Sequence, residues 1–213
     1  HCVIKRDRIS TGLPVAIDAT CSGIQIIAGM TKCKSTAEMV NVIPSSEPQD
    51  VYKVIAEKSK PYIPEKLRPH WDRKCTKRTV MTIPYNAKPF SNRSYIRDAL
   101  KEKGIEISKE ELTQTVKAVR AAMDLVVPGA MRVMKWIESE VSNAIKRGAK
   151  ELEWVTPSGF VVSQQIFKKE FERITLQVLG QCNMRVSTGD SAEVDKARHK
   201  AATAPNLIHS LDA

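Results

Sequence analysis

The sequence predicts a helix-rich α+β fold. Two long segments, 108–126 and 128–147, place apolar residues three and four positions apart, which is the period of an amphipathic helix. From 151 to 165 the pattern changes to two short strand-like runs around a Thr-Pro-Ser-Gly turn. The chain has 213 residues, 42% of them hydrophobic, so it can bury a substantial core. We expect a small sheet under several long helices.

The first predicted elements are a strand, a tight turn and a helix. Leu13 to Ile17 is an apolar run that ends at Asp18. The small residues 19–23 can turn the chain before an apolar, helix-like pattern resumes at Ile24. A carboxylate after a core strand either caps the next helix or belongs to a site. The pattern of this stretch leaves both interpretations open.

Prolines and polar residues divide the middle of the chain. Ser46 or Pro48 can start a helix that carries an apolar group of residues from 51 to 55. The prolines between 61 and 69 indicate an ordered connector. A further helix is expected from about 72 to 83.

The second half is predicted to contain two long helices, three strands and a final helix. Ser108 and Glu111 form a capping-box pattern at the start of the first long helix. Pro128 is placed to open the second one. A third strand is expected within 172–184, and a final helical piece within 204–213.

The charge and cysteine content limit the class of protein. Lys and Arg number 34 against 24 Asp and Glu, giving a net charge of +10. This excess fits a polyanionic partner or a solvated basic surface equally well. The five cysteines are scattered without a CxxC pair, as expected for free thiols in a reducing compartment. We see no signal peptide and no apolar run of membrane-spanning length, so no membrane partner is expected.

The segment DRKCTKRTVMTIPYNAKPF carries the strongest candidate site. Arg73 and Lys77 are four residues apart, so they project from one helical face, where a triphosphate could offset their mutual repulsion. Pro84 ends the helix and presents Tyr85, while Asn86 is a residue type that accepts positive φ. Considered alone, this helix favours the simpler interpretation of a solvated basic surface with an aromatic residue at its end.

The sequence DATCSGIQ, followed by RKCTKRTVMTIPYN, resembles motifs A and B of the single-subunit DNA-directed RNA polymerases. This family contains the T7-like bacteriophage enzymes and their mitochondrial relatives. Its motif B is Arg, three residues, Lys, seven residues, Tyr-Gly, and Arg73, Lys77 and Tyr85 stand at that spacing. The segments NVIPSSEPQDVY, WVTPSGF and APNLIHSLDA are further matches in the family's order. Asn86 departs from the pattern, because the family usually has glycine there.

The resemblance implies the partial palm and fingers of a right-hand nucleic-acid polymerase. Residues 1–60 would form a palm segment with motif A, and 61–150 a fingers segment with motif B and long helices. Residues 151–213 would add a fingers or palm segment with a small β-hairpin and the C-terminal helix. The family's second metal-binding aspartate, in motif C, is not found; Asp212 does not replace it, because HSLDA precedes motif C in the family. We therefore expect a fragment, incomplete at both ends and inactive alone.

The resemblance also implies a magnesium cofactor and its ligands. Asp18 would be the motif A carboxylate that binds the catalytic Mg²⁺, and the carbonyl of Ala19 would be an added ligand. Mg²⁺ takes one or two carboxylates plus substrate phosphates, and two such ions can stabilise the attacking and leaving oxygens of phosphoryl transfer.

The substrate-binding residues follow from the same resemblance. Lys77 would contact the phosphates of the incoming nucleotide and offset charge on the leaving pyrophosphate, and Arg73 would lie beside it on the triphosphate. Tyr85 would stand near the ribose. His209 would reach the minor-groove side of the new base pair and hydrogen-bond near Tyr85.

Family A DNA polymerases place a glutamate five residues after the metal-binding aspartate, whereas Gly23 stands there in this chain and leaves room for a ribose. Turn geometry also explains Gly23.

The expected function is DNA-templated RNA synthesis by the intact parent protein. Its partners would be a DNA template, an RNA product and ribonucleoside triphosphates, and the enzyme would be monomeric. We expect a phage-encoded protein in the cytoplasm of a bacterial host, with a mitochondrion or plastid as the alternative. Two other functions stay open: a catalytically inert nucleic-acid-binding module, and a family A-like DNA polymerase.

Overall fold

The computed structural model describes residues 12, 21–177 and 180–212. These residues form eight α-helices, two short 3₁₀ helices and two β-hairpins. The helices are α1 (Ser22–Thr31), α2 (Lys34–Met39), α3 (Val51–Ser59), η1 (Lys60–Tyr62), η2 (Glu65–His70), α4 (Arg73–Thr82), α5 (Pro89–Lys101), α6 (Lys109–Val126), α7 (Pro128–Lys146) and α8 (Lys196–Asp212). The strands are β1 (Glu151–Val155), β2 (Val161–Gln165), β3 (Phe167–Gln177) and β4 (Gln181–Val194). The helix-rich α+β class is confirmed.

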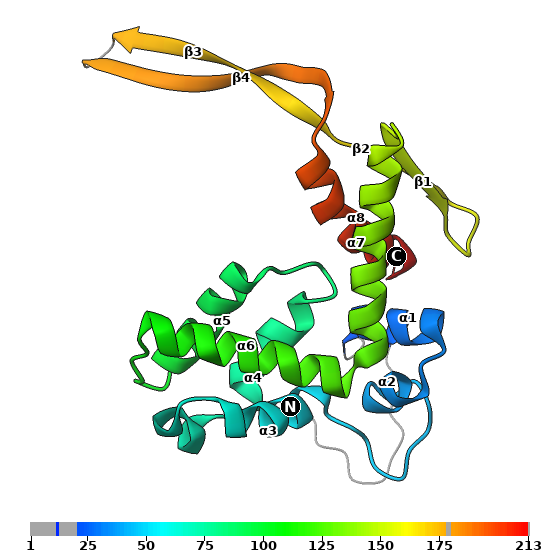
Figure 1. Cartoon of the computed structure of the whole chain (residues 1–213), viewed down its shortest axis with the longest axis vertical. Helices are drawn as coiled ribbons and strands as arrows, with labels where there is room; N and C mark the ends of the chain where they lie inside the picture. Colours follow the sequence, from blue (N-terminus) through cyan, green and yellow to red (C-terminus); the bar gives the residue numbers. More distant parts are fainter. Residues whose placement is uncertain (1–11, 13–20, 178–179, 213) are drawn as a thin grey trace.

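Figure 1 shows two parts of the helical structure: a base of helices, and a column formed by α7 and α8 that extends from it. Helices α3 to α6 form the base, and α1 and α2 lie at one end of it. Helix α7 rises from the end of α6, with α8 packed along it, and the β1–β2 hairpin lies near the upper end of α7. The β3–β4 hairpin projects away from the helices.

Local capping explains where three of the helices begin. At α6 the Ser108 hydroxyl accepts from the Glu111 N–H at 3.2 Å, and the Glu111 carboxylate accepts from the Ser108 N–H at 2.9 Å, as the capping-box pattern predicts. Asp72 caps α4 and Asp50 caps α3 by a simpler N-cap, in which one carboxylate oxygen accepts from two backbone N–H groups. Helix α3 therefore begins after Asp50, and the predicted start at Ser46 or Pro48 is wrong.

One hydrophobic core connects the helices. It runs from Ile24 in α1 through Ile55, Val119 and Ile137 to Ile208 in α8. The apolar residues predicted to line α6 and α7 are buried in it. The base, the column and the last helix therefore share a single core, which allows residues distant in sequence to be held in fixed relative positions.

The strands differ from the prediction. The structure has no sheet under helices among its described residues, but two separate antiparallel hairpins. The strand predicted within 172–184 overlaps two strands, the end of β3 and the start of β4, which pair in a second, longer hairpin with Ile174 opposite Met184. β4 continues to Val194, and α8 begins at Lys196 and passes through Pro205. The final helix is thus longer than predicted.

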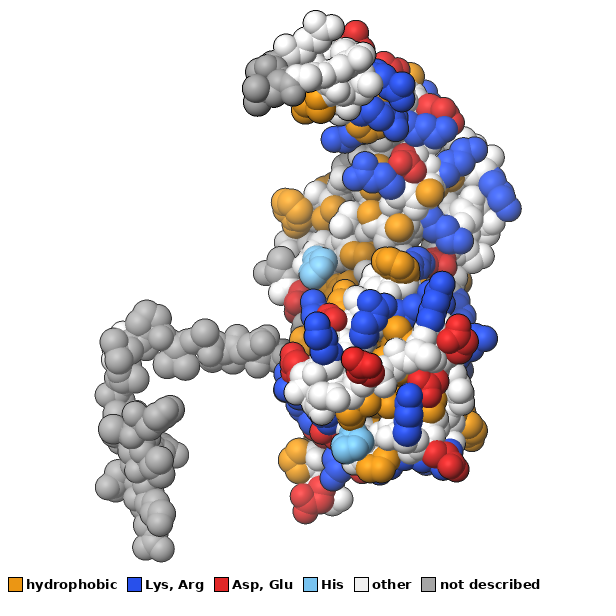
Figure 2. Space-filling view, turned by 90° about the vertical axis from the view of Figure 1, so that its left-hand side faces the viewer, with side chains coloured by type: hydrophobic (Ala, Val, Ile, Leu, Met, Phe, Trp, Pro, Cys, Tyr) orange, Lys and Arg blue, Asp and Glu red, His pale blue; other side chains and the backbone are white. Residues whose placement is uncertain are grey.

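The basic surface is distributed widely. On the face shown in Figure 2, Lys and Arg side chains occur from the upper end of the molecule to its base, with Asp and Glu among them. None of the described helices combines the length and apolar character needed to cross a membrane.

Candidate functional site

The start of α1 is the described part of the chain that is nearest in sequence to two predicted ligands, Asp18 and Ala19. Asp18 and Ala19 lie outside the described residues. The next residue that can be placed is Cys21, which caps α1 with φ 64° and ψ 45°. Few non-glycine residues adopt this left-handed conformation, so the chain makes a constrained turn at this point.

Gly23, in the first turn of α1, lies against the end of α4. A Cβ built on Gly23 would be 3.1 Å from the Tyr85 hydroxyl oxygen and 3.1 Å from the Pro84 Cβ. These distances are shorter than ordinary van der Waals contacts. The absence of a side chain at 23 therefore lets the Tyr85 hydroxyl approach the backbone of α1.

Tyr85 is presented at the end of α4 and stacks on His209. The two ring centroids are 4.5 Å apart, and the ring planes differ by 2°. Asn86 turns the chain directly after Tyr85 with φ 62°, as its residue type predicts. The structure thus brings together two predicted site residues that are far apart in sequence, in a stacked arrangement.

The β1–β2 hairpin anchors the helix that carries His209. The Gln164 amide nitrogen donates to the His199 Nδ1 at 2.9 Å and to the Thr203 hydroxyl at 3.0 Å, and its oxygen accepts from the Asn206 amide at 2.8 Å. These three partners lie four and three residues apart, on one face of α8. Gln164 is 5% exposed, so its amide forms a buried bridge between β2 and α8.

A second anchor is adjacent to His209 itself. The Trp154 indole N–H donates to the Ser210 hydroxyl at 2.9 Å, and that hydroxyl donates to the Leu207 carbonyl at 2.8 Å. At the end of the helix, the Ser22 hydroxyl donates to the Asp212 carboxylate at 3.0 Å. Helix α8 is therefore fixed both to β1 and to the first turn of α1.

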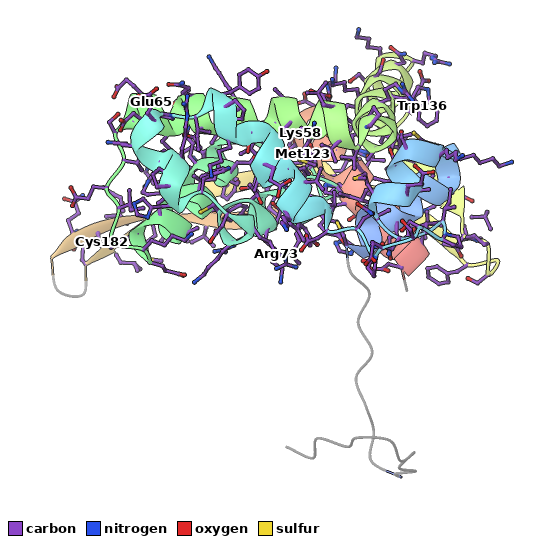
Figure 3. All side chains as sticks on the ribbon, turned by 90° about the horizontal axis from the view of Figure 1, so that it is seen from below. Lys58, Glu65, Arg73, Met123, Trp136 and Cys182 are labelled. Carbon is purple, nitrogen blue, oxygen red and sulfur yellow. The ribbon has the colours of Figure 1, made fainter. Side chains whose placement is uncertain are left out.

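Arg73 projects from the start of α4 (Figure 3) and is engaged by an acidic partner. Its Nε donates to the Asp50 Oδ2 at 2.6 Å, and its guanidinium lies 5.1 Å from the centroid of the Tyr52 ring. Burial raises the pKa of the Asp50 carboxyl, but the hydrogen bonds from Arg73 and from the Lys53 N–H outweigh this effect, so the pKa is lowered. Asp50 thus stays ionised while it both caps α3 and binds Arg73.

Tyr52 connects the start of α1 with α4. Its side chain is close enough to Cys21 for each group to affect the pKa of the other, and its carbonyl accepts from the Thr76 hydroxyl at 2.9 Å. Burial, together with the contact to Cys21, raises the pKa of the Tyr52 phenol. Burial likewise raises the pKa of the Cys21 thiol. Both groups therefore remain neutral at physiological pH and serve to pack the two segments together.

Lys77 lies one turn after Arg73 on α4 and is exposed. It borders a groove of about 250 Å³ between α4 and α5, together with Arg78 and Tyr95. The Arg78 guanidinium lies 4.4 Å from the centroid of the Tyr95 ring. Within the part of the chain that the structure describes, Lys77 forms no ion pair, so its ammonium group can receive an anion without losing an acidic partner.

Three residues that hold the site together were not singled out from the sequence. Asp50 precedes a helical pattern and carries the ordinary N-cap signal. Tyr52 and Gln164 give no comparable signal, because their partners lie on elements distant in sequence. Among the described residues, no three His, Cys, Asp or Glu side chains gather as a metal site.

Comparison with known proteins identifies relatives over almost the whole chain. A family profile described as DNA-dependent RNA polymerase matches residues 4–213. The DNA-directed RNA polymerase of Enterobacteria phage K11 is 27% identical over an alignment that covers 94% of this chain and 28% of that enzyme. T7 RNA polymerase of Escherichia phage T7 is 26% identical, with 94% and 29% covered. The mitochondrial DNA-directed RNA polymerase of Mus musculus is 28% identical, with 94% and 18% covered. The chain thus spans less than a third of the length of these relatives.

Proposed function

The chain belongs to the DNA-dependent RNA polymerase family, and we propose that the whole protein synthesises RNA on a DNA template from ribonucleoside triphosphates. The observation that carries this proposal is the arrangement at the two ends of α4. A cationic face begins the helix, and the aromatic stack of Tyr85 on His209 follows its end. We assign the first to the triphosphate and the second to the ribose and base.

Lys77 is proposed as the residue that contacts the phosphates and offsets the charge on the leaving pyrophosphate. Its exposure and its freedom from ion pairs with the described residues support this role. Arg73 would lie beside it. Because Asp50 already binds the Arg73 guanidinium, a triphosphate must share or replace that carboxylate to gain the second cation. Asp50 therefore moderates the affinity of this face for phosphate.

The proposed magnesium ligands are the Asp18 carboxylate and the Ala19 carbonyl. Both are oxygen donors of the kind Mg²⁺ prefers. In sequence they come shortly before the constrained turn at Cys21 and before Gly23, which lies close to Tyr85. The donor set therefore fits the ion. Magnesium would supply charge neutralisation at the phosphoryl group that is transferred.

Ribonucleotide selection is proposed to depend on Tyr85 and Gly23. The Tyr85 hydroxyl lies where a Cβ on Gly23 would come within 3.1 Å of it, so a larger side chain at 23 would displace it. We propose that this hydroxyl interacts with the ribose. His209, stacked on the Tyr85 ring, would support it at the minor-groove side of the new base pair.

The cellular setting and the division into palm and fingers are also proposals. Alignments extend over 257 residues for the phage K11 enzyme and 217 for the mouse enzyme, with equal coverage of this chain. The phage enzyme thus carries more inserted residues relative to this chain than the mouse enzyme does. We propose a phage-encoded, monomeric enzyme in a bacterial host, and the phage origin rests on the resemblance in motif A. The palm and fingers segments would be 1–60, 61–150 and 151–213.

The test is incorporation of labelled ribonucleotides on a DNA template by the whole protein and its Asp18→Asn variant. We expect magnesium-dependent synthesis that Asp18→Asn abolishes while DNA binding persists. Binding without incorporation under any condition would favour the inert binding module. Equal use of deoxynucleotides would favour the DNA polymerase.

A further inference from the structure

Asn86 bonds to α8 at the one turn where a proline interrupts the backbone ladder. Pro205 has no N–H, so it cannot donate to the carbonyl of Ala201 four residues earlier. The Asn86 Nδ2 donates to that Ala201 carbonyl at 3.0 Å, across 115 residues of sequence. The side chain thus supplies a donor to the carbonyl that the proline leaves without its helical partner.

The other end of the same amide is also engaged. The Asn86 Oδ1 accepts from the Lys88 Nζ at 2.6 Å, and the Lys88 Nζ also donates to the Glu138 carboxylate at 2.6 Å. The turn after α4 is therefore tied to α8 directly and to α7 through Lys88. This turn carries Tyr85, and α8 carries His209 two turns beyond Ala201.

We propose that Asn86 is a positioning residue: by donating to the Ala201 carbonyl freed by Pro205, it fixes the turn that presents Tyr85 and holds the Tyr85 ring on His209. The importance of the stack for nucleotide binding rests on the proposed function, but the positioning itself does not. Asn86 stands where the family pattern has glycine. Both residue types accept the φ of 62° found here, and only asparagine can also bond to α8.

Two variants separate the side-chain bond from the backbone conformation. Asn86→Asp keeps a residue type that tolerates left-handed φ and keeps an acceptor for Lys88, but it removes the donor to Ala201. Asn86→Gly keeps the backbone conformation and removes the side chain. Because the anchors of α8 at Gln164 and Trp154 are unchanged, both variants should retain the fold.

The chain offers a matched control at Asn41. This asparagine also has positive φ, 58°, and its Nδ2 donates to the Gln49 carbonyl at 2.7 Å. Asn41→Asp therefore removes the same kind of bond from the same kind of turn, between residues that are not part of α4 or α8. Any general cost of the substitution appears equally in this variant.

The experiment records the imidazole proton resonances of the 213-residue chain by NMR, with His209→Gln identifying the His209 signals. Stacking on Tyr85 shifts them upfield. We expect Asn86→Asp and Asn86→Gly to move them toward the free-histidine position, and Asn41→Asp to leave them in place, with unchanged far-ultraviolet circular dichroism. An unmoved His209 signal in a folded Asn86 variant would overturn the proposal. If Asn86→Asp fails to fold, the His209 signal of Asn86→Gly provides the test. Because no catalysis is involved, failure of this test is distinct from failure of the polymerase assignment.

Discussion

The hydroxyl of Tyr85 occupies the space that a side chain on Gly23 would need. A Cβ at position 23 would come within 3.1 Å of that oxygen and 3.3 Å of the Cζ that bears it. Tyr85 cannot move aside freely, because its ring is stacked on His209. The first turn of α1 thus packs closely against the residues that follow α4, and it can do so because position 23 has no side chain.

Gly23→Ala should therefore destabilise the chain, although alanine is the better helix former. We expect a loss of roughly 1–2 kcal/mol in the free energy of unfolding, because the overpacking cost exceeds the gain in helix propensity. Gly29→Ala is the control on the same helix, since a Cβ there meets nothing within 4 Å. It should stabilise by about 0.5–1 kcal/mol. Urea unfolding measures both, and equal stabilisation by the two variants would contradict the close fit at Gly23.

Asp50 should contribute stability that depends on pH. Its folded pKa is lowered from an ordinary value of 3.8, so the contribution is complete above that value and is lost as the pH falls through the folded pKa. Asp50→Asn keeps a capping oxygen but loses the charge, and should cost about 0.2–1 kcal/mol at pH 7, because the pair with Arg73 is part exposed. Asp50→Ala loses the cap as well, at a further cost of about 0.5–2 kcal/mol.

The measurement for Asp50 is urea unfolding of the three proteins between pH 7 and pH 2. The difference between the parent chain and Asp50→Asn should shrink as the pH falls through the acid range. A difference that stays constant, or that grows on acidification, would show that the Asp50 charge does not stabilise the fold.

Cys33 should react faster than Cys21 and Cys75 at neutral pH. Hydrogen bonds from Ser35 and then Thr36 lower its pKa from 9.0 to about 7, whereas burial raises the pKa of Cys21 and of Cys75. Alkylation with iodoacetamide, followed by peptide mass spectrometry, should give a labelling rate for Cys33 with a midpoint near pH 7.

Ser35→Ala is the control for the Cys33 prediction. It removes the leading cause of the lowered pKa, so labelling should slow at pH 7 and remain fast at pH 9. A Cys33 midpoint that already lies near pH 9 in the parent chain would contradict the assigned hydrogen bonds.

Gln164 should matter far more than its neighbour Gln165. Gln164→Met leaves buried groups on α8 without partners, and we expect a loss of about 1–3 kcal/mol. Gln165 is exposed on the opposite face of β2, and Gln165→Met should change stability by less than about 0.5 kcal/mol. Equal effects of the two substitutions on urea unfolding would refute the anchoring of α8 by Gln164.

Features that depend on only a few neighbouring residues, such as helix starts and turn conformations, were predicted from the sequence. The capping box at Ser108 and the proline at 128 set the starts of α6 and α7, and Asn86 adopts the positive φ expected of it. Helix α5 was missed because Lys88 gives no side-chain cap and polar residues interrupt its apolar period. The β3–β4 hairpin was predicted only as a single strand within 172–184, because its strands are almost entirely exposed and burial imposes little alternation on their sequence.

The site could be predicted only in part, because the contacts that hold it together join residues that are far apart in sequence. The spacing of Arg73 and Lys77 places them on one helix, as expected. The bonds from Ser22 to Asp212 and from Asn86 to Ala201 join residues that are 190 and 115 positions apart, and no local pattern predicts such contacts. Nor does the sequence reveal that Arg73 is engaged by Asp50, which requires α3 and α4 to be packed together.

The most direct test of the central claim is template-directed RNA synthesis by the whole protein with Lys77→Ala, compared with Lys74→Ala. Lys74 is on the same helix and is paired with Glu102 at 2.7 Å, so its loss removes an equal charge without removing the proposed phosphate contact. We predict that Lys77→Ala lowers the rate roughly 10²–10³-fold, as expected for removal of a group that stabilises transition-state charge, while Lys74→Ala leaves it unchanged. Equal rates for the two variants would contradict the proposed role of α4 in binding the triphosphate.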